Sequence, residues 1–195
     1  MLLPKVPANP PARLAVADAG RVQDRAVLAQ TIAIQRASPE YYALKLGNAV
    51  LAARLIRDLR KNAGMVYAIN PSIDAGQTRS LYRVEYACDR QNVAKVHASV
   101  TRELEEMRSA PVGADELQRA KAMLLRQISL AEASTDAIAQ GLIARWELDL
   151  PLDEPLLAAR RYIDLSAEDI QNAFARWMRP ADLVRVTQGP NSSLN

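Results

Sequence analysis

The chain has 195 residues, 49% of them hydrophobic and 24% charged, values typical of a globular protein with one sizeable core. Glycine is sparse and aromatic residues make up only 5%, a composition that favours helix over an all-β architecture. The formal net charge is only +3 and no long block of like charges occurs, which argues against nucleic-acid binding. Because Cys88 is the only cysteine, an internal disulfide and a thiolate metal cluster are both excluded.

The sequence carries no clear targeting signal. No apolar run approaches the ~18 residues that cross a bilayer, so no membrane span is expected. Prolines follow Met1 closely, where a signal peptide would have an apolar core. Both a periplasmic and a cytoplasmic location stay open, and the opening also fits the start of a fragment of a longer protein.

The chain divides into three expected regions. Residues 1–12 are rich in proline and are predicted to be an extended arm or linker. Residues 13–190 are expected to form one α+β domain, and residues 191–195 a polar tail. Strand-like runs at residues 13–18 and 26–34 open the domain, the second with the alternation of period two that a half-buried strand requires.

A β-hairpin is expected in the middle of the chain. Residues 66–73 and 80–88 are its strands, and residues 74–78 are the turn between them. One face of the second strand is apolar and is formed by Tyr82, Val84, Tyr86 and Cys88. Since the alternate face carries Arg83 and Glu85, one side of the sheet should be covered and the other partly wet.

A long helix precedes this hairpin. It is expected to begin at Ser38 and Pro39, which suit an N-cap and a first helical turn, and to end at about Asn62. Gly64 follows in the position where a left-handed residue commonly ends a helix.

The second half of the chain is expected to be mostly helical. Apolar residues recur at helical spacing over residues 93–107 and 117–128, and helices are also expected over residues 135–148 and 167–178. Pro151 and Pro155 are expected to frame a loop, and residues 183–187 form a last strand. This order predicts an α+β fold, with a mostly antiparallel sheet of about five strands and helices packed on one face.

Catalytic residues are hard to find. His97 is the only histidine, whereas a catalytic zinc site needs three protein ligands, so His97 is interpreted as a solvated surface residue. A nucleophilic pair of Cys88 and His97 is conceivable, but Cys88 lies on the apolar face of a strand, where a thiol is inert. Glu103, Glu105 and Glu106 are interpreted as a solvated helix face, and no phosphate-binding glycine loop occurs.

The end of the long helix is the most suggestive region for binding. It carries four cations, Arg54, Arg57, Arg60 and Lys61, and a glycine turn then leads to Tyr67. A reversal at the glycine can bring Arg60 and Tyr67 to the same rim, where a guanidinium and a phenol can hold a peptide carbonyl or a developing oxyanion. From spacing alone the simpler interpretation remains open, in which the cations stabilise the helix dipole and Tyr67 is a strand residue.

These segments resemble the C-terminal half of the peptidase M16 family, the pitrilysin and insulinase peptidases. The matching motifs, in order, are YYAL at residues 41–44, NAVL at 48–51, RLIRDLR at 54–60, GMVY at 64–67, EYACD at 85–89, ELQRAK at 116–121, SAEDI at 166–170 and GP at 189–190. Each piece is short, but together they cover about residues 13–190 in the family's order.

The resemblance implies a non-catalytic role in a zinc peptidase. In M16 peptidases one half carries an H-x-x-E-H zinc motif. The other half has no zinc and supplies an arginine and a tyrosine, seven residues apart, to the peptide cavity. These map onto Arg60 and Tyr67. The implied partners are therefore an H-x-x-E-H half, in the same natural chain or a separate subunit, and an extended peptide, with zinc in the partner and no cofactor or metal here.

One departure from the family pattern supports a second interpretation. The family has a glycine-rich segment before the arginine helix, which lets a peptide approach the backbone closely. In this chain Leu51 is followed by Ala52 and Ala53 and then directly by Arg54. The alternative is therefore a structural or assembly subunit of M16 ancestry that has no peptidase role.

Overall fold

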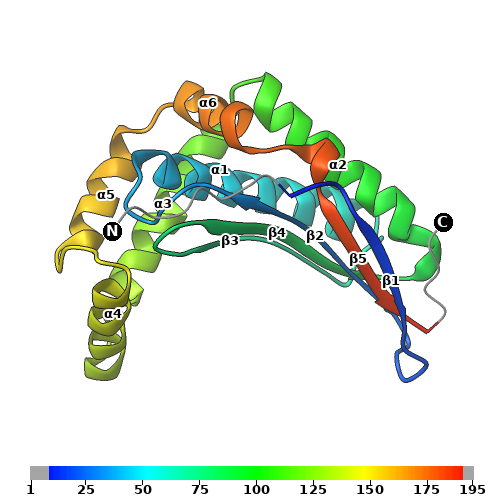
Figure 1. Ribbon diagram of the computed structural model, residues 1–195. Coiled ribbons are helices and arrows are strands. Elements are labelled where there is room, and N and C mark those ends of the chain that lie inside the picture. Colours follow the sequence, from blue (N-terminus) through cyan, green and yellow to red (C-terminus); the bar gives the residue numbers. More distant parts are fainter. Residues whose placement is uncertain (1–8, 191–195) are drawn as a thin grey trace.

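Five strands form one sheet in the order β1-β5-β2-β4-β3 (Figure 1). Their bounds are Arg13–Ala17 for β1, Asp24–Ile32 for β2, Ala68–Ala75 for β3, Ser80–Cys88 for β4 and Val184–Gly189 for β5. The strand β1 runs parallel to β5, and the other neighbouring pairs are antiparallel. The predicted sheet of about five mostly antiparallel strands is confirmed, and its parallel pair joins the first and last strands of the chain.

The computed structural model describes residues 9–190. The expected polar tail over residues 191–195 and most of the expected arm over residues 1–12 lie outside the described part. Within it, Asn9 lies against the sheet, because its side-chain Oδ1 accepts the backbone N–H of Thr31 at 2.9 Å and its Nδ2 donates to the carbonyl of Asp182 at 2.9 Å.

The helices lie on one face of the sheet, as predicted (Figure 1). The main helices are α1 Pro39–Leu55, α2 Val93–Ser109, α3 Ala114–Leu130, α4 Thr135–Glu147, α5 Glu154–Asp164 and α6 Ala167–Trp177, and the short segments are η1 Ile56–Asn62, η2 Arg90–Asn92 and η3 Pro180–Asp182. None of the helices found between residues 9 and 190 is long and apolar enough to cross a membrane.

The prediction that Pro151 and Pro155 frame a loop is wrong for Pro155. Helix α5 begins at Glu154, so Pro155 lies in its first turn. Proline fits there because the first N–H groups of a helix have no intrahelical partner and the ring already holds the helical φ angle. The helix that follows, amphipathic through Ala158 and Tyr162, was not predicted from the sequence.

The two faces of the sheet differ as the alternation predicts. Tyr82, Val84 and Cys88 are fully buried under the helices. On the opposite face Arg83 and Glu85 are partly exposed and form an ion pair at 3.3 Å. The helices therefore bury one face, and the other face is left to polar contacts.

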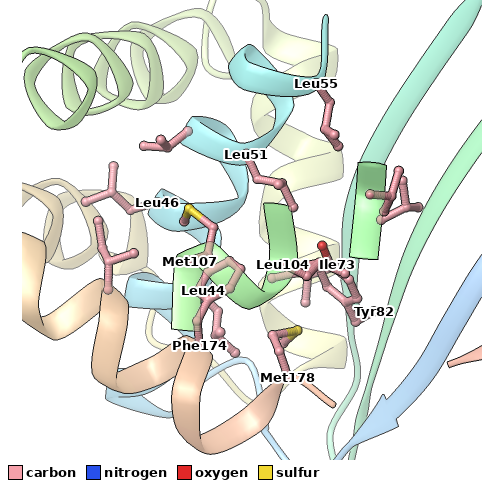
Figure 2. Packing of buried hydrophobic residues seen from close by; sticks show 14 of the residues in the cluster. Leu44, Leu46, Leu51, Leu55, Ile73, Tyr82, Leu104, Met107, Phe174 and Met178 are labelled. Atoms are coloured by element: carbon pink, nitrogen blue, oxygen red, sulfur yellow. The ribbon is translucent and has the colours of Figure 1, made fainter. Parts of the chain in front are cut away.

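Helix α1 is buried on nearly all sides. Its buried residues include polar and small ones as well as leucines, and they are Tyr41, Tyr42, Ala43, Leu44, Leu46, Gly47, Asn48, Val50, Leu51, Arg54 and Leu55. A helix without a wet face must be enclosed by other elements. Figure 2 shows this enclosure, with leucines of α1 packed among Tyr82 of β4, Met107 of α2 and Phe174 of α6.

Close contact between α1 and α6 depends on Gly47. A Cβ atom at this position would lie 2.4 Å from Cε2 of Phe174 and 2.7 Å from Cγ2 of Ile170, distances that real Cβ atoms do not adopt. Both of these neighbours have no exposed surface. Glycine is therefore required by the space between the two helices.

We predict that Gly47→Ala lowers the free energy of unfolding by about 1–3 kcal/mol, because the added methyl group overpacks the contact with Phe174. Gly141→Ala in α4 is the matched control, since a Cβ there meets only ordinary contacts, at 3.4 Å from the guanidinium of Arg145. The control should gain about 0.5–1 kcal/mol from helix propensity. Urea denaturation of both variants measures the difference, and equal effects would contradict the packing argument.

Candidate functional site

Helix α1 does not stop at Leu55 but continues with a wider π-helical turn, η1, over Ile56–Asn62. The backbone N–H of Ala63 bonds to the carbonyl of Asp58 at 3.1 Å, and that of Met65 to the carbonyl of Leu59 at 2.8 Å. Gly64 has a φ of 62°, the left-handed conformation that ends the helix as predicted. Segments with π-helical bonding occur often at functional sites.

Two buried side chains hold this turn in place, and the residue that follows each of them is exposed. Leu59 and Val66 are 4% and 5% exposed and lie in the core. Arg60 and Tyr67 each follow one of these two residues, and both are exposed, Tyr67 at 51%. The structure therefore places the two predicted residues on either side of one glycine turn. Within residues 9–190 no hydrogen bond or cation–π contact joins their side chains.

Tyr67 is held by an acidic residue that the sequence prediction did not include. Its hydroxyl donates to Oδ1 of Asp89 at 3.0 Å, and its backbone N–H donates to the carbonyl of Ala87 at 2.9 Å. The hydrogen bond to Asp89 and the charge of that carboxylate raise the pKa of the phenol. Tyr67 therefore stays protonated, with a fixed hydroxyl that has lone pairs available to a further donor.

The four cations of this region fall into distinct environments. Arg54 is buried, at 9% exposed. Arg57 is exposed and forms two bonds with the carboxylate of Asp58, at 2.7 Å and 3.0 Å. Arg60 and Lys61 point to solvent, and neither forms an ion pair in the described part of the chain. Arg60 is thus available to a ligand without breaking an existing bond.

A groove of about 410 Å³ lies between α1 and α3, beside this turn. Its floor is made of small and apolar residues, among them Ala49 and Ala53. Arg57, Lys61 and Arg119 line it, together with one carboxylate, that of Glu116. The groove therefore combines apolar residues with three cations and one anion.

Arg54 is the centre of a partly buried ionic cluster. Its Nη2 and Nε bond the two carboxylate oxygens of Glu116 at 2.7 Å and 2.9 Å, a bidentate arrangement. Its Nη1 lies 3.4 Å from Glu106 and 3.8 Å from Glu103. The hydrogen bond from Arg54 lowers the pKa of Glu116. The cluster ties α1 to both α2 and α3.

The interpretation of Glu103, Glu105 and Glu106 as a solvated face is wrong for the first of them. Glu103 is only 9% exposed, and burial raises the pKa of its carboxyl. Glu105 and Glu106 are exposed, as predicted. The difference arises because Glu103 faces Arg54, a contact with a residue far away in the sequence.

His97 is also less solvated than predicted. It is partly buried, its Nδ1 has no hydrogen-bond partner, and burial lowers its pKa. Cys88, in contrast, is fully buried as expected, and burial raises the pKa of its thiol to about 11, which makes it a poor nucleophile. Across residues 9–190 no three histidine, cysteine or carboxylate side chains gather as a metal site.

Comparison with known proteins identifies related domains. The family model described as "Peptidase M16 inactive domain" matches residues 3–124. No curated protein matches the chain. The peptidase M16 inactive domain from Pseudomonas fluorescens is similar with a TM-score of 0.82 and 23% identity, covering 100% of this chain. This chain covers only 48% of that one, so it spans about half the length of that relative.

Two other solved structures share the fold. The inactive peptidase domain from Bordetella parapertussis has a TM-score of 0.70 and 17% identity, with 89% of this chain and 94% of that chain covered. A chain of complex III2 from Candida albicans has a TM-score of 0.77 and 15% identity, with 92% of this chain and 46% of that chain covered. The fold therefore occurs in inactive peptidase domains and in a chain of complex III2.

We predict that Arg54→Gln lowers the free energy of unfolding at pH 7 by about 3 kcal/mol, because it leaves the buried carboxylate of Glu103 with only the 70% exposed side chain of Arg102, at 4.0 Å, as a cation. Arg57→Gln removes the same charge from a side chain that is 55% exposed, and should cost no more than about 0.5 kcal/mol. Urea denaturation of the two variants and the wild type measures this. Equal losses would contradict the assignment of Arg54 as the centre of the cluster.

The stability gap between wild type and Arg54→Gln should also depend on pH. Arg54 depresses the folded pKa of Glu116, so the stability that this contributes is present above the unfolded value of ~4.3 and is lost as pH falls through the folded pKa. Protonation of Glu103 at low pH also removes the buried charge that the variant leaves facing only the exposed Arg102. Denaturation curves from pH 7 to pH 3 should therefore show a narrowing gap, and a constant gap would contradict this linkage.

Proposed function

The chain belongs to the peptidase M16 inactive-domain family, and we propose that it is the non-catalytic, substrate-binding half of an M16 zinc peptidase. The observation that carries this proposal is the exposed pair Arg60 and Tyr67, which flank one glycine turn with the spacing of the family's substrate-binding pair. The partner would be an H-x-x-E-H half that holds zinc, and the substrate an extended peptide. The chain would not cleave peptides alone.

The side chains at the turn suit the recognition of a peptide backbone. The guanidinium of Arg60 can donate hydrogen bonds to a peptide carbonyl oxygen, or to an oxyanion that would develop there during hydrolysis. The partner's zinc would supply the activation of water. Tyr67 has its proton directed to Asp89, so its oxygen can accept a peptide N–H. A fixed hydroxyl loses little conformational freedom on binding, which favours affinity.

The groove beside the turn supports an extended ligand. The family's glycine segment is missing here, and Ala52 and Ala53 lead directly to Arg54; of these two alanines, Ala53 lines the groove, together with Ala49. A methyl group keeps a peptide farther from the backbone than glycine does, but far less so than a longer side chain would. The cationic edge formed by Arg57 and Lys61 favours peptides with acidic residues on this side.

The first test is cleavage of an extended peptide by this chain together with its cognate zinc-bearing half. Arg60→Ala should lower kcat/KM on the order of 10- to 100-fold, because a hydrogen bond from a charged group is worth ~1.5–3 kcal/mol, and Tyr67→Phe should lower it about 2- to 10-fold, because the bond to a neutral phenol is worth ~0.5–1.5 kcal/mol. Arg126→Ala is the control, since Arg126 is an exposed cation on α3 outside the turn and the groove. Its rate should equal that of the wild type.

Complex formation with the zinc half is measured alongside by size-exclusion chromatography. If both substitutions leave complex and rate unchanged, the roles assigned to Arg60 and Tyr67 are wrong. If the chain alone cleaves peptides and a chelator stops it, the non-catalytic assignment itself is wrong.

A structural or assembly subunit is the second candidate function. Two observations favour it, the alanines in place of the family's glycine segment and the large exposed apolar side chains of Ile143 and Trp146, at 58% and 79% exposed. Large exposed apolar surface often marks contact with another protein. This function predicts a stable complex with a partner and no binding of peptide. Peptide binding that is lost in Arg60→Ala would decide against it.

A further inference from the structure

Helix α4 projects away from the other helices (Figure 1). Between it and the helices α3 and α5 lies a cavity of about 180 Å³. Ala137, Gly141 and Arg145 of α4 line this cavity at a spacing of four residues, so they lie on one side of the helix. Two of the three have little or no side chain, which leaves the space open around the guanidinium of Arg145.

Arg145 has an environment that is unfavourable for an isolated cation. It is only 9% exposed, and its Nε is buried without a hydrogen-bond partner. Its one ion pair in the described residues reaches Glu132 at 3.6 Å, too far for a hydrogen bond, and the side chain of Glu132 is 46% exposed. A buried charged group that lacks hydrogen bonds is costly, so such groups usually have a partner.

Arg36 brings a second guanidinium to the same cavity. Its Nη2 bonds Oε1 of Glu154 at 2.5 Å, and its Nη1 is buried without a partner. Glu154 also accepts the hydroxyl of Tyr42 at 3.2 Å. The carboxylate of Glu154 is therefore occupied by Arg36 and Tyr42, which leaves the half-exposed carboxylate of Glu132, beyond hydrogen-bond distance, as the counter-charge of Arg145.

We propose that this cavity binds a carboxylate group, held by Arg145 and Arg36. A carboxylate can accept hydrogen bonds from the guanidinium of Arg145, whereas a dianion such as phosphate would bring more negative charge beside the two carboxylates of the cavity, Glu132 and Glu154. The planar carboxylate matches the fork of donors on a guanidinium. The group can come from a small monocarboxylate or from the C-terminus of a peptide. The inference does not rest on the proposed function, because it uses neither Arg60 nor Tyr67.

The test is calorimetric titration of the full chain, without any zinc half, with three probes. These are sodium acetate, a hexapeptide with a free C-terminus, and the same hexapeptide with an amidated C-terminus and no acidic side chain. We expect saturable binding of at least one of the first two probes and none of the third. Binding of acetate alone identifies a small carboxylate as the ligand, and tighter binding of the free peptide identifies a C-terminus.

Variants link the binding to the cavity. Arg145→Gln should weaken binding at least about tenfold, as loss of a charge-assisted hydrogen bond requires. Arg160→Gln removes the same charge from an exposed residue of α5 and should leave binding unchanged. Gly141→Leu fills the cavity and keeps its charges, so it should also abolish binding.

Circular dichroism and thermal melting establish that each variant is folded before it is titrated. If Arg145→Gln does not fold, the titration of Gly141→Leu tests the proposal instead. The proposal is overturned if the wild type binds neither carboxylate probe, or if it binds the amidated peptide equally well. It is also overturned if the folded variants of Arg145 and Gly141 bind like the wild type.

Discussion

The enclosure of α1 is the constraint on which the rest of this domain depends. Most of the helix surface is buried, so the sheet, α3 and α6 must all pack against it to cover its apolar residues. The missing side chain of Gly47 allows α6 to approach closely. Because the helix is fixed on several sides, its C-terminal end leaves the core at a defined point, and that point is the turn at Gly64 that carries the candidate site.

Arg54 and Arg60 have different roles because one is buried and the other is exposed. Arg54 lies one helical turn before the end of the enclosed region and is occupied by three carboxylates. Arg60 lies past the buried side chain of Leu59 and contacts only solvent among the described residues. The ionic cluster of Arg54 stabilises the attachment of α1 to its neighbours, and so it holds the exposed cation in place without competing for it. The arrangement suits a binding turn on a rigid base.

The features that the sequence predicted correctly have local causes. Alternation of apolar and polar residues predicts β4, and the helical spacing of apolar residues predicts α2 and α3. The conformational freedom of glycine predicts the turn at Gly64. The features that it missed depend on contacts between distant segments. Burial of Glu103 requires Arg54, and the fixed hydroxyl of Tyr67 requires Asp89. Likewise, no local pattern indicates that β1 runs parallel to β5, because that pair joins opposite ends of the chain.

The turn with Arg60 and the cavity with Arg145 differ in their effect on the stability of the unbound domain. Arg60 is hydrated, so leaving it unpaired costs the free domain nothing, and a function for it depends on a second half that completes a cavity. Nε of Arg145 is buried without a hydrogen-bond partner, which costs the unbound domain free energy. A carboxylate that binds only the folded chain would offset this cost and stabilise the fold by mass action. A peptide bound at Arg60 would also stabilise the fold by mass action, but only a ligand in the cavity under α4 would in addition relieve a cost that the unbound domain carries.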